Sequence, residues 1–80
     1  MRDNKAANRF ELDIDGLITF ATYRLNAGKL YINHVESPMA LRGKGAAGKL
    51  MQAIVNHATS KNLTIVPVCG YAASWIERNT

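Results

Sequence analysis

One segment of the sequence concentrates glycine and basic residues at a spacing that could bind an anion. Residues 41–50 read Leu-Arg-Gly-Lys-Gly-Ala-Ala-Gly-Lys-Leu and join a predicted strand to a predicted helix. Glycine lets the backbone approach a ligand closely. The first amides of a helix lack intrahelical partners and carry the positive end of its dipole, so they form a ready anion site. We expect this segment to bind a pyrophosphate through Arg42, Gly43, Lys44, Gly45, Ala46, Ala47, Gly48 and Lys49.

Two common phosphate motifs match this segment only in part. Gly43, Gly48 and Lys49 follow the P-loop spacing, but Leu50 stands where a serine or threonine would bind magnesium. Gly43, Gly45 and Gly48 also match the glycine pattern of dinucleotide-binding folds. That pattern should open a βαβ unit and be followed by an acid that contacts the ribose, and neither is present. A glycine-rich turn into a helix with a basic end, without a ligand, is the simpler alternative.

The first half of the chain is predicted to form a meander of three antiparallel strands. Arg9–Ile14 alternates apolar and charged residues, which is typical of a half-buried strand. Asp15-Gly16 suits a two-residue hairpin turn. The second strand covers Leu17–Leu25 and the third covers Leu30–Val35. Residues 1–8 are polar, and we expect them to form a flexible lead-in before the first strand.

The second half changes to helical periodicity. After a loop that contains Pro38, apolar residues recur at helical spacing from about Gly45 onward. Leu63–Val68 is a short apolar strand, which we expect to pair parallel to the third strand through a right-handed crossover. Tyr71–Glu77 predicts a second helix. The order β-β-β-α-β-α predicts an α/β fold.

Length and composition indicate a single soluble domain over residues 1–80. The chain has 80 residues, of which 48% are hydrophobic and 20% charged, values that exclude a wholly disordered protein. No run approaches the roughly 20 apolar residues of a membrane helix, and residues 1–16 are too charged for a signal peptide. A single cysteine can form neither an internal disulfide nor a multi-cysteine zinc site, so we expect a cytoplasmic protein without bound metal.

The formal net charge of +4 indicates an anionic partner. Charges balance up to Leu41, so the whole excess lies from Arg42 onward. A nucleic-acid-binding module is one alternative, but such a site interleaves basic and aromatic residues. Here the aromatic residues are spread over the predicted strands. We therefore favour a small anionic ligand over a nucleic acid.

The glycine-rich segment also contains the pattern R-x-x-G-x-A, at Arg42, Gly45 and Ala47. This pattern resembles the acetyl-CoA pyrophosphate motif of the GNAT acetyltransferase superfamily, which lies between a central strand and the next helix. Nearly the whole chain resembles a small single-domain GNAT subfamily with an active-site cysteine, through Asn8–Leu12, Tyr23–Leu25, His34, Pro38, Leu41–Gly43 and Pro67–Cys69. The resemblance implies a minimal GNAT-like fold without the usual N-terminal helices, and acetyl-CoA as co-substrate.

The resemblance further implies the course of the pantetheine arm of acetyl-CoA. The arm runs along the strand that ends at His34–Ser37, and this strand splays from the one that ends at Cys69. Pro67 lacks an amide hydrogen and independently favours such a splay. The subfamily usually has threonine and valine where this chain has Val35 and Ser37. Backbone contacts can survive both changes, so Ser37 is included among the donor-binding residues.

Cys69 is a candidate catalytic residue. It ends a predicted strand, where ligands bind in open α/β sheets, and the resemblance places it beside the acetyl group. Its thiolate could accept the acetyl group and pass it on, or its thiol could line the site while an amine attacks directly. The structural alternative is a buried small hydrophobic residue.

His34 and Glu36 are the candidate general bases for the incoming amine. Strand alternation puts His34 on the same face as Leu30 and Ile32, so a partly buried structural histidine is its alternative. Glu36 ends the same strand, where the resemblance implies a general-base glutamate. Tyr71 is a weaker candidate for protonating the leaving thiolate.

Together these features predict an acetyl-CoA-dependent N-acetyltransferase that acts on a small-molecule amine or a protein lysine. A CoA-binding protein without catalysis and the nucleic-acid-binding module are the alternatives. Trp75 and His57 are expected to be structural. We expect a monomer or a weak dimer, and the chain stops earlier than is usual in the subfamily, as a truncated or a short variant would.

Overall fold

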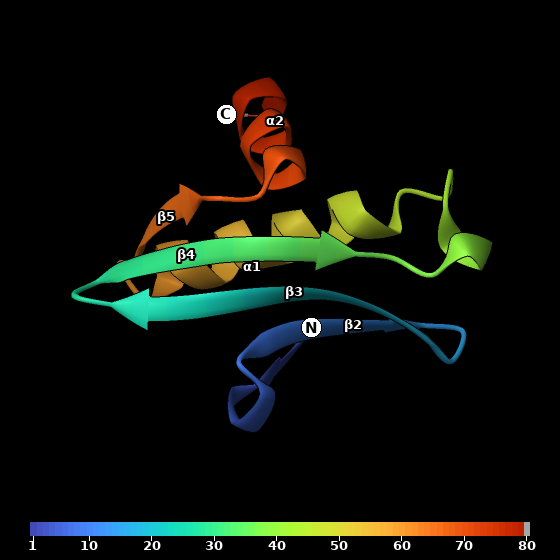
Figure 1. Ribbon diagram of the computed structural model, residues 1–80, viewed down its shortest axis with the longest axis horizontal. Coiled ribbons are helices and arrows are strands. Elements are labelled where there is room, and N and C mark those ends of the chain that lie inside the picture. Colours follow the sequence, from blue (N-terminus) through green and yellow to red (C-terminus); the bar gives the residue numbers. More distant parts are fainter. Residues whose placement is uncertain (80) are drawn as a thin grey trace.

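A five-stranded sheet organises the computed structural model, which describes residues 1–79 (Figure 1). Its strands lie side by side in chain order: β1 (Arg2–Asn4), β2 (Arg9–Ile14), β3 (Leu17–Asn26), β4 (Lys29–Glu36) and β5 (Thr64–Pro67). Neighbouring strands are antiparallel except β4 and β5, which are parallel. Helix α1 (Ala46–Ser60) connects β4 to β5, and α2 (Gly70–Asn79) follows β5. Two short 3-10 turns complete the fold, η1 (Lys5–Ala7) and η2 (Met39–Leu41).

This architecture confirms the predicted α/β fold, the antiparallel meander and the parallel crossover. The first hairpin turns at Asp15 and Gly16, whose φ angles of 53° and 81° are both left-handed. Such a pair of positive φ angles matches the right-handed twist of the flanking strands.

The core fills the space between the sheet and the helices. Helix α1 crosses one face of the sheet (Figure 1) and buries Leu50, Met51 and Ile54 there. Helix α2 adds Ala72 and Trp75 to the same core. The spacing of the buried residues on α1 follows the helical period, so the apolar stripe of α1 faces the sheet.

The prediction that residues 1–8 form a flexible lead-in is wrong, because the sheet begins before Arg9. Residues 2–4 form the edge strand β1, and Arg2 pairs with Glu11 in the ladder. The Glu11 carboxylate is only 3% exposed, and it accepts hydrogen bonds from the guanidinium groups of Arg2 and Arg9 and from the Asn4 amide. A buried carboxylate requires such partners, and two of the three come from β1.

The prediction that His34 lies on the same face of the strand as Leu30 and Ile32 is also wrong. In the β3–β4 ladder Tyr23 pairs with Ile32 and Thr22 pairs with His34, so Asn33 is an extra residue without a partner across the ladder. A bulge of this kind reverses the alternation of faces beyond it. His34 therefore leaves the core face, its side chain is 57% exposed, and Val35 packs against the core instead.

Candidate functional site

The loop before α1 is anchored at both ends and exposed between them. Leu41 and Ala46 are 3% and 2% exposed, whereas residues 42–45 are exposed. The Lys44 amide donates to the Leu41 carbonyl at 3.1 Å, which closes a tight turn. Gly43 and Gly45 have φ angles of 81° and 74°, and a Cβ on either would meet nothing within 4 Å. Both positions therefore require glycine for their left-handed backbone conformation, and the space beside the loop stays open.

The start of α1 presents free backbone amides. Its N-cap Gly45 makes no side-chain cap, and no acidic residue lies in the first turn. The Lys49 amide donates to the Gly45 carbonyl at 3.0 Å, so the amides of residues 46–48 precede the first bond of the helical ladder. These amides and the helix dipole together attract an anion.

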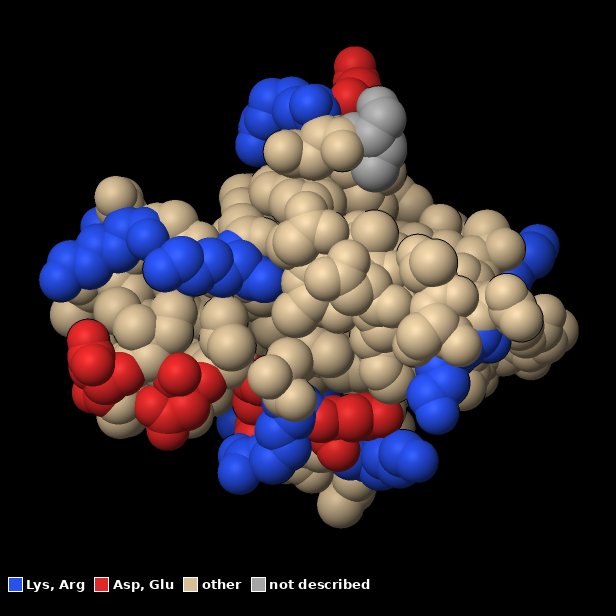
Figure 2. Space-filling model, turned by 180° about the vertical axis from the view of Figure 1, so that it is seen from behind, with Lys and Arg blue, Asp and Glu red and all other residues tan. Residues whose placement is uncertain are grey.

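Basic side chains surround this helix start. Arg42, Lys44 and Lys49 are all exposed. In Figure 2 a band of Lys and Arg atoms crosses the end of the molecule that carries the η2–α1 loop. Three of the five basic residues from Arg42 onward thus lie where the free amides are.

Gly48 differs from the other glycines of the segment. It lies inside α1, and a Cβ on it would come within 3.3 Å of the Trp75 indole nitrogen. Glycine at position 48 was predicted to let the backbone approach a ligand. In the structure it lets α1 pack closely against α2. Trp75 is 8% exposed and belongs to the core, as expected.

Strands β4 and β5 separate at Ile32. The last ladder pair is Ile32 with Pro67, and the Ile32 carbonyl then accepts both the Val68 and Cys69 amides at 3.0 Å. Beyond this point the chain turns into α2, so residues 33–36 of β4 have no ladder partner on β5. The predicted splay is thus present, and Pro67 lies where it begins.

Cys69 lies at the junction of β5 and α2. Its side chain is half-buried and packs against the core, and its carbonyl accepts the Ala73 amide at 3.0 Å. This bond begins α2, so the thiol stands at the amino end of a helix, where negative charge is favoured.

His34 and Glu36 form a pair on the opposite face of the sheet from α1. The His34 Nε2 and Glu36 Oε1 atoms are 3.2 Å apart, and both side chains are more than half exposed. The Phe20 ring lies beside His34, with centroids 6.4 Å apart. Among the hydrogen bonds, ion pairs and ring contacts of residues 1–79, none joins this pair to Cys69.

The remaining predicted residues are placed as follows. Ser37 is half-buried, and its hydroxyl lies 3.2 Å from that of the buried Thr19. Tyr71 is exposed on the first turn of α2. His57 packs edge-on against Phe10, with centroids 5.2 Å apart.

Sequence reasoning did not anticipate the Asn33 bulge or the Thr19–Ser37 contact. The polar Asn33-His34 pair inside an otherwise apolar strand was the available signal for the bulge. The hydroxyl contact joins β3 to a residue beyond β4, and no local pattern marks such a pair.

Within residues 1–79 no group of three or more metal-ligating side chains comes together. Neither helix of this part of the chain has the length and apolar character that crossing a membrane requires.

Comparison with known proteins adds two findings. A family model described as GCN5-related N-acetyl-transferase matches residues 9–80. The chain is also similar to the NMR solution structure of a GCN5-like protein from Staphylococcus aureus, proposed to be an N-acetyltransferase. The two sequences are 30% identical, the TM-score is 0.65, and the match covers 89% of this chain and 72% of the other.

Proposed function

The chain belongs to the GCN5-related N-acetyltransferase family and is an N-acetyltransferase, and from this premise we propose that it takes the acetyl group from acetyl-CoA and transfers it to an amine. The family generally uses acetyl-CoA and an acceptor. The proposal assigns the donor to the η2–α1 loop and to the end of β4, and it assigns proton transfer to the His34–Glu36 pair.

The start of α1 is the observation that carries this proposal. Its first-turn amides are free of helical partners, no acidic residue lies in that turn, and Arg42 and Lys44 flank it. The residues therefore fit a pyrophosphate, whose oxygens accept hydrogen bonds from backbone amides. Gly43 and Gly45 keep the approach open because neither position carries a side chain.

The edge of β4 beyond Ile32 offers a path for the pantetheine arm. Its backbone has lost β5 as a ladder partner, and Ser37 lies at its end. An extended chain with amide groups can pair with such a free strand edge. This path leads from the Arg42–Lys49 segment toward Cys69, whose backbone amide donates to the Ile32 carbonyl.

The His34–Glu36 pair supplies a base for direct transfer. When the amine nitrogen attacks the acetyl carbon, an N–C bond forms, the thioester C–S bond breaks and CoA leaves as its thiolate. The amine proton passes to the pair, in which Glu36 hydrogen-bonds the imidazole and orients it. Cys69 lines the site in this scheme, because its thiol packs against the core and makes no contact with the pair among residues 1–79.

Binding of acetyl-CoA tests the donor site. In a titration of the labelled protein followed by NMR, we expect saturable shifts at residues 43–48. The double variant Arg42→Gln/Lys44→Gln should bind about tenfold more weakly, whereas Arg78→Gln, an exposed charge on α2, should bind normally. Absence of both a thermal shift and a perturbation at residues 43–48 would reject the proposal.

The Cys69→Ala variant tests the direct route. We expect it to transfer acetyl groups to amines in a panel of peptides and polyamines, whereas His34→Gln and Glu36→Gln should both slow transfer and alter its pH profile. An inactive Cys69→Ala, together with a hydroxylamine-labile acetyl group on Cys69 seen by mass spectrometry, would replace the direct route with a covalent one.

A further inference from the structure

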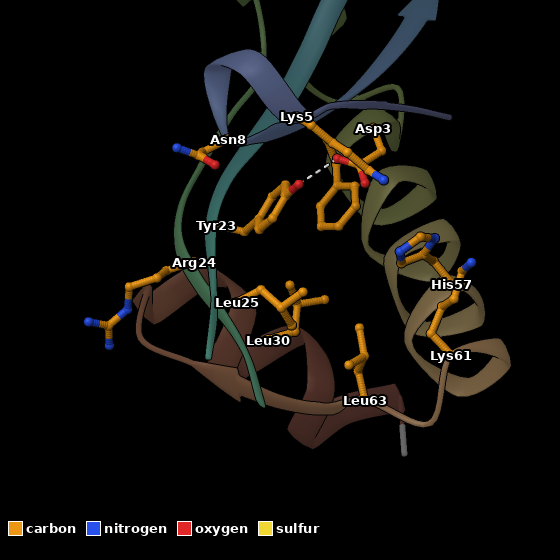
Figure 3. Close-up of a pocket in the computed structure, with 11 residues that line it drawn as sticks. Asp3, Lys5, Asn8, Tyr23, Arg24, Leu25, Leu30, His57, Lys61 and Leu63 are labelled. Atoms are coloured by element: carbon orange, nitrogen blue, oxygen red, sulfur yellow. Dashed lines mark hydrogen bonds between the residues drawn. The ribbon is translucent and has the colours of Figure 1, made fainter. Parts of the chain in front are cut away.

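A groove of about 890 Å³ opens at the end of α1 that lies away from the Arg42–Lys49 segment (Figure 3). Residues of η1, β3 and the last turn of α1 line it. Helix α1 has 15 residues and therefore rises about 22 Å. The groove is thus separated from the proposed donor site by most of the length of the molecule's longest helix.

Aromatic rings form the floor of the groove, and apolar and polar side chains share its walls. The rings of Phe10 and Tyr23 stack with centroids 4.3 Å apart, and His57 meets Phe10 edge-on. Leu63 lines the groove, and so does Leu25, which is 55% exposed although it is a large apolar residue. Phe10 is only 1% exposed, so a flat apolar molecule in the groove would contact the half-buried rings of Tyr23 and His57.

Positive charge lies at the mouth of the groove. Lys5 from η1 and Lys61 at the end of α1 approach it from different elements, whereas Arg24 points away and stacks over Tyr31 (Figure 3). The acidic lining residue Asp3 accepts a hydrogen bond from the Tyr23 hydroxyl at 2.6 Å.

The phenol of Tyr23 uses one of the acceptor positions of the Asp3 carboxylate. Burial, together with the hydrogen bond to Asp3, raises the pKa of Tyr23 to about 12, so the phenol stays a donor at neutral pH. Lys5 and Lys61 outnumber this one carboxylate among the lining residues, so the mouth of the groove favours an anion.

We propose that this groove binds a small anion with a flat apolar body, such as an aromatic carboxylate. Its ring lies against the half-buried Tyr23 and His57, and its anionic group pairs with Lys5 and Lys61. Ring burial supplies most of the affinity, because exposed ion pairs contribute little. The lysines supply the preference for negative charge.

Two probes with the same ring and opposite charge test this site. In NMR titrations of the full chain, 1-naphthylacetate should shift the amides of Leu25, His57 and Leu63 saturably and leave residues 43–48 unchanged. It should bind roughly fivefold more tightly than 2-(1-naphthyl)ethylamine. The variant Lys5→Gln/Lys61→Gln should remove that preference, and Lys44→Gln/Arg78→Gln, which loses the same charge elsewhere, should keep it.

Equal affinity for the two probes, or an unchanged preference in the Lys5→Gln/Lys61→Gln variant, would overturn the proposal. Shifts of the groove amides on raising the protein concentration without a probe would also overturn it, because they would assign the groove to a second copy of the chain. Each outcome is independent of acetyl-CoA binding, which is read at residues 43–48.

Discussion

The indole nitrogen of Trp75 lies 3.3 Å from the place that a Cβ on Gly48 would occupy. This contact joins the first turn of α1 to α2, which begins directly after Cys69. Two segments of the proposed acetyl-transfer site are therefore held together by a glycine, whose backbone amide is one of the proposed anion donors, and a tryptophan without a proposed chemical role.

Gly48→Ala should lower the free energy of unfolding by about 1 kcal/mol, because the added methyl group overpacks a buried contact. Gly70→Ala is the matched control, since a Cβ on Gly70 meets nothing within 4 Å. It should stabilise the protein by about 0.4–1 kcal/mol through the unfolded state. Urea unfolding measures both, and the fluorescence of Trp75, the single tryptophan, should change only in Gly48→Ala. If Gly48→Ala were instead more stable than the parent protein, the Trp75 side chain would be able to shift away at little cost in free energy.

Gly45→Ala should weaken acetyl-CoA binding as well as folding. Gly45 has a φ angle of 74°, and the left-handed conformation costs a residue with a Cβ roughly 1–2 kcal/mol. An N-cap that shifts to relieve this strain moves the free amides of the first turn. Gly45→Asn should retain more affinity, because asparagine tolerates this conformation. Calorimetric titration with acetyl-CoA measures both affinities. Equal affinity of the Gly45→Ala and Gly45→Asn variants would contradict the prediction.

Glu11→Gln should be less stable than the parent protein at neutral pH, and the difference should shrink in acid. Hydrogen bonds from Arg2, Arg9 and Asn4 lower the pKa of Glu11 to about 2. Because the unfolded chain has a glutamate pKa of about 4.3, this stabilisation is complete above that pH and is lost as the pH falls toward 2.

Denaturant unfolding from pH 7 to pH 2 measures that difference for Glu11→Gln. The variant Glu77→Gln, which alters an exposed carboxylate on α2, is the control and should track the parent throughout. A gap between Glu11→Gln and the parent that stayed constant down to pH 2 would show that the carboxylate charge is not what stabilises β1.

Local patterns in the sequence were enough to predict the β2–β3 hairpin, both helices and the parallel pairing of β5. The hairpin and the helices depend on residues close together in the chain, such as Asp15 and Gly16 at the turn. The pairing of β5 with β4 joins distant residues, and it followed from the handedness rule for crossovers. Strand β1 was missed because its pairing depends on Glu11, a carboxylate that looks solvent-facing in an alternating strand.

The candidate site was predictable to different degrees. The loop and helix start around Gly43 and Gly45 follow from glycine and lysine spacing, since the chemistry lies in the local backbone. The face of His34 does not follow from alternation, because one extra residue in β4 reverses it. The groove at the far end of α1 escaped notice because Phe10, Tyr23 and His57 come from three separate elements.

Deleting Asn33 should leave the sheet register intact while weakening acetyl-CoA binding. Without this residue Ile32 and His34 become neighbours, and they can keep their present partners Tyr23 and Thr22 in a regular ladder. A bulge bends its strand and increases the twist, so its loss should straighten β4 where β4 leaves β5. We therefore expect a near-normal Tm and a Kd for acetyl-CoA that is about tenfold higher.

Deleting Tyr31 is the control for that experiment. Its removal turns Leu30, which is 1% exposed, out of the core while Ile32 keeps its place. Loss of a buried leucine costs about 2–5 kcal/mol, so this deletion should lower Tm strongly. If the Asn33 deletion proved equally unstable, the bulge would be needed for folding. If that deletion bound acetyl-CoA normally, the bend of β4 would have no part in holding the donor.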